Sequence, residues 1–309
     1  MCKGFKKAAR KAGFNAAAAA FVFLTAAVFF AGCSKKEGGF DSSKSITVAA
    51  REEGSGTRSA FVELFGVEEK MRDGRKKDLT TKEAVIAKQT DIMMSIVSHD
   101  LYAIGYISAG SLNSTVKYIS IEGAAPQAEA VKNGSYPVSR PFYIAALKDN
   151  PAEKNTARDF TAFMLSREGQ NIASKNYVPV NESAAPYESS FLEGSDEPVK
   201  ITVGGSSSVA PLMEKLVEEY IKINPKAVIE MQISDSSTGL NSVLSGALDI
   251  GLSSRDLKES ELEKLSPVKI AVDGIAVIVN KDNPLANASK AQVRAVFTGE
   301  SPVWSDVIK

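Results

Sequence analysis

Short apolar runs alternate with stretches of helical periodicity along most of the chain. The runs of strand length lie at 46–50, 103–107, 116–121, 142–147, 200–203, 228–233, 249–252 and 270–280, the last containing the long apolar segment 275–279. Apolar residues recur with the spacing of an amphipathic helix at 58–65, 84–99, 157–173, 212–223 and 236–245. Strands and helices that alternate at these lengths predict an α/β fold with mixed, mostly parallel sheets.

Two turns of small residues directly precede predicted helices. The first is Arg51–Thr57 and the second is Gly205–Pro211. The start of a helix directs backbone N–H groups and the positive end of the helix dipole outward, which favours an anion. Each turn taken alone is most often only a helix cap, and Arg51 alone is most often a surface charge or a partner of Glu52 or Glu53. Only the two turns together indicate an anion site.

The segment Glu188–Val199 breaks the alternation of strands and helices. It is rich in Ser, Gly, Asp, Glu and Pro and contains few apolar residues. This composition is typical of a surface linker.

The N-terminus has the pattern of an export signal. Five basic residues precede an apolar run at 14–30, which ends in small residues and Cys33. This order of charge, apolar run and small residues is that of a secretory signal. An uncleaved membrane anchor is the alternative, although the run is shorter than the ~20 residues of a full span. The segment resembles a bacterial lipoprotein signal, apart from Phe30, and this implies removal of residues 1–32, lipidation of Cys33 and a tether at 33–45.

Charge and composition argue against several classes of function. The chain has 37 basic and 37 acidic residues, and loss of residues 1–32 would leave a formal charge of −5. A general basic surface for nucleic acid is therefore not expected. Cys2 would be removed and Cys33 acylated, so no disulfide is expected. His99 is the only histidine, and no phosphate-binding P-loop or nucleophile elbow is present. We therefore expect no enzyme, metal site or cofactor.

Nine motifs in two blocks resemble one family. The later block contains Gly205–Pro211, Ser236–Gly239, Asp249–Arg255, Asp273–Asn280 and Phe297–Glu300 with Trp304. The earlier block contains Arg51–Arg58, Ala103–Ile107, Tyr136–Pro141 and Glu168–Gln170. The later block resembles the N-terminal half of the periplasmic phosphate-binding proteins of ABC transporters, and the earlier block resembles their C-terminal half. The resemblance implies a type II periplasmic-binding-protein fold, in which two lobes enclose a cleft.

The order of the two blocks is reversed relative to the family. A circular permutation explains this order, with the linker at 188–199 joining the former termini. Two alternatives are a sequence that continues beyond Lys309 and a pairing of half-proteins between chains. Permutation implies one discontinuous lobe, 40–138 with 273–309, and one continuous lobe, 139–272. It also requires Phe40 and Lys309 to be neighbours in one lobe.

The resemblance also implies a set of phosphate ligands. Arg51 would supply charge and a bidentate fork, and Glu53 would orient it. The other implied ligands are Ser55, Gly56 and Thr57 at one helix start, Ser207 and Ser208 on the first turn of another helix, Ser236 at a third, and Ser254. Some members of the family have an aspartate at the position of Ser254, which accepts the proton of HPO₄²⁻. Asp235 and Asp273 are alternative acceptors, and Arg255 is a second candidate cation with a surface role as its alternative.

The resemblance predicts an exported, lipid-anchored, monomeric phosphate receptor that delivers phosphate to the permease of an ABC transporter. A receptor or sensor for another tetrahedral oxyanion, such as sulfate, arsenate or molybdate, is the alternative. A serine hydrolase or phosphatase is the enzymatic alternative, and no motif supports it.

Overall fold

The structure is a computed structural model that describes residues 39–72, 75–148, 155–190 and 199–308. The chain divides into two units, Met1–Gly39 and Phe40–Lys309. All of the helices and strands described below lie in the second unit. The export signal, Cys33 and the first part of the expected tether lie outside the described residues. Within the described ranges, no helix has both the length and the apolar character needed to cross a membrane.

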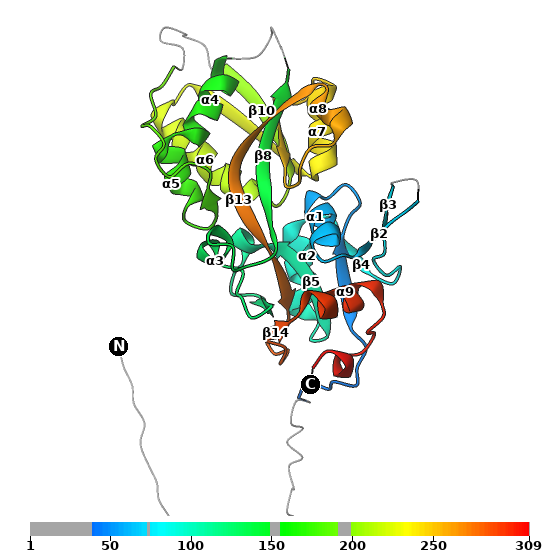
Figure 1. The fold of residues 1–309 in the computed structure, drawn as a ribbon. Coiled ribbons are helices and arrows are strands. Elements are labelled where there is room, and N and C mark those ends of the chain that lie inside the picture. Colours follow the sequence, from blue (N-terminus) through cyan, green and yellow to red (C-terminus); the bar gives the residue numbers. More distant parts are fainter. Residues whose placement is uncertain (1–38, 73–74, 149–154, 191–198, 309) are drawn as a thin grey trace, which may run out of the picture. The chain divides into compact units, whose positions relative to one another are not determined.

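One mixed sheet runs through this unit (Figure 1). Its strands follow the order β11-β10-β12-β8-β13-β5-β1-β4, and β6 and β9 pair with β13 beside this path. The strands are β1 (Thr47–Arg51), β4 (Val85–Ala87), β5 (Ala103–Ser108), β6 (Lys117–Tyr118), β8 (Ser139–Leu147), β9 (Val178–Pro179), β10 (Val199–Ser206), β11 (Ala227–Ser234), β12 (Ile250–Ser253) and β13 (Leu265–Val279). The outer strands pair in parallel, whereas β13 pairs antiparallel with β8 and β5.

The helices follow strands in the order expected of an α/β fold. They are α1 (Gly56–Leu64), α2 (Thr90–His99), α3 (Ala128–Lys132), α4 (Asn155–Leu165), α5 (Arg167–Ala173), α6 (Ala210–Ile223), α7 (Ser236–Leu244), α8 (Glu259–Leu262) and α9 (Lys290–Thr298), with 3-10 turns η1 (Ala109–Ser111) and η2 (Trp304–Asp306). Two small sheets pair β2 (Glu68–Lys70) with β3 (Lys76–Asp78) and β7 (Ser120–Ile121) with β14 (Asn287–Ala288). The fold class inferred from periodicity is confirmed.

Strand β13 contributes to four clusters of buried apolar residues, of which two are large. Its first part, Leu265–Gly274, pairs with β8, and its last part, Ile275–Val279, pairs with β5. The buried members of one large core come from 48–138 and 275–307, and those of the other come from 142–271. The buried members of the two large cores divide near the lobe boundaries that the permuted order implies, at 139 and 273, and the lobes themselves stay a proposal.

The first core supports the strand that carries Arg51. Phe61 of α1 stacks on Tyr106 of β5 with ring centroids 3.9 Å apart, and Phe297 packs edge-on against Phe61. The Tyr106 hydroxyl accepts a hydrogen bond of 3.0 Å from the Arg51 backbone N–H. Burial of this hydroxyl raises the pKa of Tyr106 to about 12. Packing of large aromatic rings thus places the end of β1 beside α1.

Three predicted elements differ from the structure. The helix expected at 84–99 begins only at Thr90, because Val85–Ala87 pairs with β1 as a strand. The helix expected at 157–173 is two helices, since the Ser166 side chain caps a new start by accepting from the Gly169 N–H. The strand expected at 116–121 is likewise split into β6 and β7, which belong to different sheets.

The expected tether and linker are both shorter than predicted. Phe40 packs on Tyr102 and Trp304, with ring centroids 5.3 and 5.5 Å apart, so residues 40–45 are folded rather than tethering. Val199 already belongs to β10, and Ser190 is held by two hydrogen bonds to Asp159. Residues 191–198 of the linker lie outside the described residues. At both places, apolar contacts and hydrogen bonds hold residues that the sequence composition assigned to a tether or a linker.

The beginning and end of the second unit lie side by side. Ser45 forms a β-bridge with Val303, and the Trp304 N–H donates to the Lys44 carbonyl at 3.1 Å. The segments near these two ends also meet in Figure 1. A permuted order requires this proximity, and the permutation itself stays a proposal.

Candidate anion-binding site

Three helix starts meet where the two cores adjoin. Ser55 caps α1 by accepting from the Arg58 N–H, Ser236 is the first residue of α7, and Ser207 and Ser208 lie in the turn before α6. The prediction that Ser207 and Ser208 lie on the first turn of α6 is wrong, because α6 begins at Ala210. The Ser207 N–H is used in a backbone hydrogen bond to the Ser234 carbonyl, so its hydroxyl is the group that faces the other residues of the site.

The predicted hydroxyl groups form one buried cluster. Thr57 Oγ1 lies 2.6 Å from Ser208 Oγ, which joins α1 to the turn before α6. Ser254 Oγ accepts from Ser206 Oγ at 2.9 Å and lies 3.4 Å from Ser236 Oγ. The members Ser55, Thr57, Ser206, Ser207, Ser208, Ser236 and Ser254 are all buried. Hydroxyl groups can donate or accept, so the cluster can satisfy several oxygens of one ligand.

Gly56 lets α1 approach the other side of the site closely. A Cβ atom at Gly56 would lie 2.5 Å from Ser236 Oγ and 2.7 Å from Ser254 Oγ. These distances are shorter than any normal contact, so a side chain at this position would separate α1 from α7. Glycine is therefore required here by the approach of the two segments.

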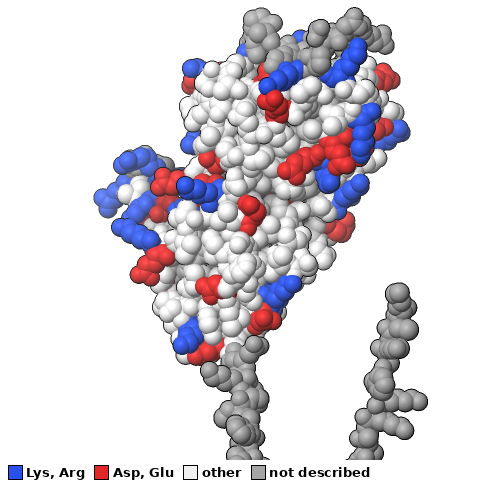
Figure 2. Space-filling model, turned by 180° about the vertical axis from the view of Figure 1, so that it is seen from behind, with Lys and Arg blue, Asp and Glu red and all other residues white. Residues whose placement is uncertain are grey.

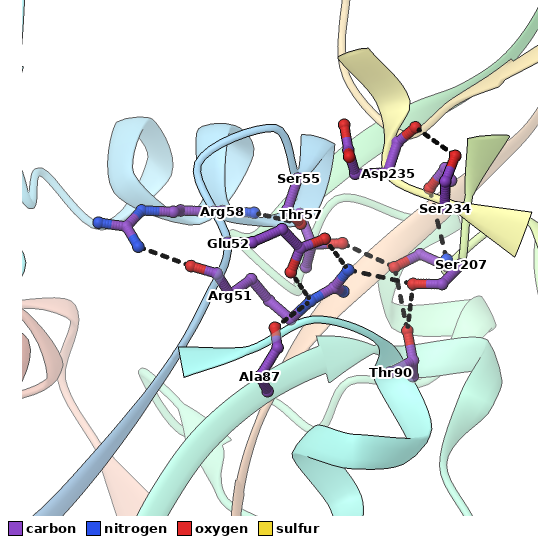
Figure 3. A network of polar contacts seen from close by, with 12 residues as sticks. Arg51, Glu52, Ser55, Thr57, Arg58, Ala87, Thr90, Ser207, Ser234 and Asp235 are labelled. Atoms are coloured by element: carbon purple, nitrogen blue, oxygen red, sulfur yellow. Dashed lines mark hydrogen bonds and ion pairs between the residues drawn. The ribbon is translucent and has the colours of Figure 1, made fainter. Parts of the chain in front are cut away.

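Arg51 is the buried cation of the site (Figure 3). Its guanidinium donates to Glu52 through Nε and Nη2, to the Ala87 carbonyl through Nε, and to Ser207 Oγ through Nη2 at 3.0 Å. Nη1 is buried and has no hydrogen-bond partner. An unpartnered buried donor costs free energy, and an anion bound among these hydroxyls would provide its acceptor.

Glu52, and not Glu53, orients Arg51. Both oxygens of the Glu52 carboxylate accept hydrogen bonds from the guanidinium, Oε1 from Nη2 at 2.7 Å and Oε2 from Nε at 2.9 Å. Glu53 is exposed and lines a cavity of about 520 Å³ together with Arg58 and Lys258. The prediction for Glu53 is wrong because the turn after β1 directs its side chain to solvent.

Thr90 belongs to the same cluster and was not predicted from the sequence. It is the first residue of α2, it is buried, and its Oγ1 lies 3.3 Å from Ser207 Oγ and 3.5 Å from Ser208 Oγ. A fourth helix start therefore faces the hydroxyl cluster (Figure 3). Thr90 could not be recognised as the first residue of a helix from the sequence, because the apolar pattern predicts a helix that begins six residues earlier, at Ala84.

The two alternative acceptors do not touch the cluster. The Asp235 carboxylate accepts from the N–H and hydroxyl of Thr238 as the cap of α7. Asp273 Oδ1 accepts from the Gly110 N–H, and its Oδ2 accepts from Arg140 Nη2 at 3.3 Å. Burial raises the pKa of Asp273 to about 6, although Arg140 and the Gly110 N–H act to lower it.

Arg255 has a structural role. It is buried and donates through both terminal nitrogens to the Glu261 carboxylate at 2.8 Å. Nη2 also donates to the Ser237 hydroxyl at 3.1 Å. The surface role expected for Arg255 is wrong, since its fork is occupied by this buried ion pair, which holds the loop after Ser254.

This geometry suits a small tetrahedral oxyanion. Hydroxyl groups, helix starts and one arginine supply many donors around one position, while the Glu52 carboxylate is engaged by Arg51. Within the described ranges, no cluster of His, Cys, Asp and Glu residues has the arrangement of a metal site. On the face shown in Figure 2, basic and acidic side chains are interspersed rather than gathered into one basic patch.

Comparisons with known proteins agree with this class of site. Residues 36–168 and 184–309 match the PBP superfamily domain. The chain is 44% identical over 281 residues to "Phosphate-binding protein PstS 2" of Streptococcus agalactiae, covering 90% of this chain and 93% of that relative. It matches "Phosphate-binding protein PstS" of Staphylococcus haemolyticus at 38% identity over only 111 residues, 33% of this chain and 35% of that relative.

A solved structure has the same fold. The phosphate-binding protein of a phosphate ABC transporter from Streptococcus pneumoniae is 38% identical, with a TM-score of 0.65. The match covers 86% of this chain and 100% of that structure. The fold and the site thus define a binding protein of the periplasmic-binding-protein class. The chain belongs to the PBP superfamily and, within it, to the family of phosphate-binding proteins named PstS.

Proposed function

We propose that this protein binds inorganic phosphate without turning it over and delivers it to the permease of an ABC transporter. The observation that carries the proposal is the buried Arg51 Nη1, unpartnered among hydroxyls from four helix starts. The names of the full-length relatives support phosphate as the ligand. The proposed ligands are Arg51, Ser55, Gly56, Thr57, Thr90, Ser207, Ser208, Ser236 and Ser254.

Calorimetric titration with phosphate tests this function. We expect Arg51→Ala to remove most of the affinity, because it deletes the buried cation of the site. Arg294→Ala is the matched control, since Arg294 is a half-buried arginine far from the hydroxyl cluster in sequence and paired with Glu300. Arg255→Ala should weaken binding less than Arg51→Ala. No binding heat with the unaltered chain, or equal affinities of the Arg51 and Arg294 variants, would contradict the proposal.

Selectivity among tetrahedral oxyanions is the second question that the site raises. Ser254 stands where some members of the family have a carboxylate, and neither Asp235 nor Asp273 touches the hydroxyl cluster. A carboxylate repels a fully ionised anion such as sulfate, so its absence favours a site that also admits sulfate. Competition of sulfate, arsenate and molybdate against phosphate distinguishes the two functions. Competition by sulfate only in large excess would support phosphate as the ligand.

Export and lipid anchoring complete the proposed function. Residues 1–32 would act as a lipoprotein signal and Cys33 would carry the lipid, which places a monomeric receptor on the outer side of the cell membrane. The sequence pattern supports this part of the proposal. Mass spectrometry of the membrane fraction tests it, because cleavage and acylation at Cys33 change the mass of the N-terminal peptide.

The circular permutation is also a proposal. The adjacency of Ser45 and Val303 and the division of the cores near 139 and 273 support it. A match of 90% of this chain to one relative and of only 33% to another is expected when the order of the two halves differs among relatives. A variant that joins residue 308 to residue 40 by a short loop and opens the chain within 191–198 should still fold and bind phosphate.

A further inference from the structure

A buried ion pair connects the two strands that pass between the cores. Arg140 of β8 and Asp273 of β13 are direct cross-strand partners. Both residues are almost fully buried, at 3% and 1% exposure, and Arg140 Nη2 lies 3.3 Å from Asp273 Oδ2. The proposed ligand set uses neither residue. The pair lies where both strands leave one core and enter the other.

Arg140 also contacts the backbone of the proposed anion site. Its Nη1 donates to the Ser254 carbonyl at 3.2 Å, and the Ser254 hydroxyl belongs to the cluster. Burial lowers the pKa of Arg140 to about 10, and the charge of Arg51 contributes in the same direction, while Asp273 opposes it. Charges in a buried region are weakly screened, so the charge of Arg140 acts on the neighbouring anion site.

The surroundings of Asp273 can accommodate both of its protonation states. The groups facing it are Arg140 from β8, the Gly110 N–H of η1, Ser108 of β5, and the phenols of Tyr136 and Tyr177. Three polar atoms around this pair, Arg140 Nε, Ser108 Oγ and Tyr177 OH, are buried and make no hydrogen bond of normal geometry. A hydroxyl can donate to a carboxylate or accept the proton of a carboxylic acid, so neither state leaves Asp273 without a partner.

We infer that Asp273 sets the net charge that Arg140 presents to the anion site, so that binding of the anion is coupled to protonation of the Asp273 carboxyl group. The inference rests on the proposed phosphate site. An ionised Asp273 neutralises Arg140, whereas a protonated Asp273 leaves a positive charge directly behind Ser254. Arg140 is thus a positioning residue, which holds the Ser254 carbonyl and carries the charge that Asp273 controls.

The coupling has a definite sign. The pKa of Asp273 is raised to about 6, so the uncompensated positive charge of Arg140 develops as the pH falls through this value. Phosphate is then bound more tightly than it would be beside a neutral pair. Linkage is reciprocal, and a bound anion therefore increases the proton affinity of Asp273 by the same factor.

Phosphate titrations of the full chain in detergent, between pH 5.5 and 8.5, test the coupling. The comparison is between the unaltered chain and Asp273→Asn, because the ionisation of phosphate itself cancels in the ratio of their dissociation constants. We expect this ratio to be near one at pH 5.5 and about fivefold or more in favour of Asp273→Asn at pH 8.5, where only the unaltered chain carries the negative charge. Asp282→Asn, which changes an exposed carboxylate, should give a ratio that does not vary with pH.

Proton uptake provides a second measurement. Titrations in two buffers of different ionisation heat give the number of protons bound with phosphate. We expect Asp273→Asn to lose uptake between pH 6 and 7.5, and Arg140→Gln to move that uptake to higher pH, because the carboxylate then lacks its cation. Arg140→Lys keeps the charge and should restore the original range. If Asp273→Asn does not fold, the two Arg140 variants still decide the question.

The outcomes separate this inference from the proposed function. Absence of phosphate binding at every pH would remove the proposed function and the coupling with it. Phosphate binding with a constant ratio between pH 5.5 and 8.5, and with equal proton uptake in all variants, would overturn the coupling alone.

Discussion

The hydroxyl of Thr57 lies 2.6 Å from that of Ser208, although the two residues are 151 positions apart. Thr57 lies on α1, whose buried face belongs to one core, and Ser208 lies before α6, which packs into the other. A ligand at this contact would therefore hold the two cores together. Binding proteins of two lobes close around ligands in this way.

We expect Thr57→Val and Ser208→Ala each to weaken phosphate binding by about 10-fold to 100-fold. A hydrogen bond to a charged group contributes about 1.5–3 kcal/mol, and 1.4 kcal/mol corresponds to a factor of ten. The double variant should lose less than the sum of the two losses, since both hydroxyls contact one ligand. Calorimetry measures all three, with Ser242→Ala, a half-buried serine of α7 whose hydroxyl donates to the Thr238 carbonyl, as the control. Equal affinities of Thr57→Val and Ser242→Ala would exclude Thr57 as a ligand.

Gly56→Ala should lower phosphate affinity at least tenfold and leave the thermal stability nearly unchanged. The new Cβ would lie 2.5 Å from Ser236 Oγ, so α1 and α7 could not approach to their present distance. Alanine is a better helix former than glycine, which limits any loss of stability. Gly39→Ala is the matched control, because no atom lies within 4 Å of its Cβ position. Unchanged affinity of Gly56→Ala would show that the site does not need this close approach.

Arg255→Ala should destabilise the protein by about 3–5 kcal/mol, because it leaves Glu261 buried and unpaired. Burial acts to raise the pKa of Glu261, but hydrogen bonds from Arg255 and the Lys258 N–H hold it below its usual value. Chemical denaturation measures the loss. The double variant Arg255→Ala/Glu261→Ala should be more stable than Arg255→Ala alone, and the opposite order would show that the ion pair is not the source of the effect.

Asp159→Asn should reduce stability at neutral pH by about 1–3 kcal/mol. Burial acts to raise the pKa of Asp159, yet hydrogen bonds from Tyr187, Tyr220 and Ser190 lower it on balance. A depressed pKa in the folded state stabilises above the unfolded value of about 3.9 and loses this effect as the pH falls through the folded pKa. The free energy of unfolding, measured with urea, should therefore differ less between the unaltered chain and Asp159→Asn below pH 4. A difference that is constant from pH 3 to 7 would contradict this reasoning.

Most of the long helices and strands, and the two small-residue turns that contribute to the site, could be predicted from local pattern alone. The apolar run at 275–279 and the small-residue turns at Arg51 and Gly205 are local features. The run lies within β13, and the turns lead into α1 and α6. The helix expected from Ala84 was predicted wrongly, because Val85–Ala87 gains more by pairing with β1 than by continuing a helix. A short apolar segment has no periodicity of its own that would decide between the two states.

The sequence by itself determined the α/β class, the two small-residue turns that precede helices and the family, because these depend on neighbouring residues. Only the tertiary structure decided that Glu52 rather than Glu53 holds Arg51, that Thr90 joins the hydroxyl cluster, and that Arg140 and Asp273 pair behind Ser254. A one-residue difference at a turn reverses the direction of a side chain. Partners more than a hundred residues apart meet only when two cores pack together, and no local pattern encodes that distance.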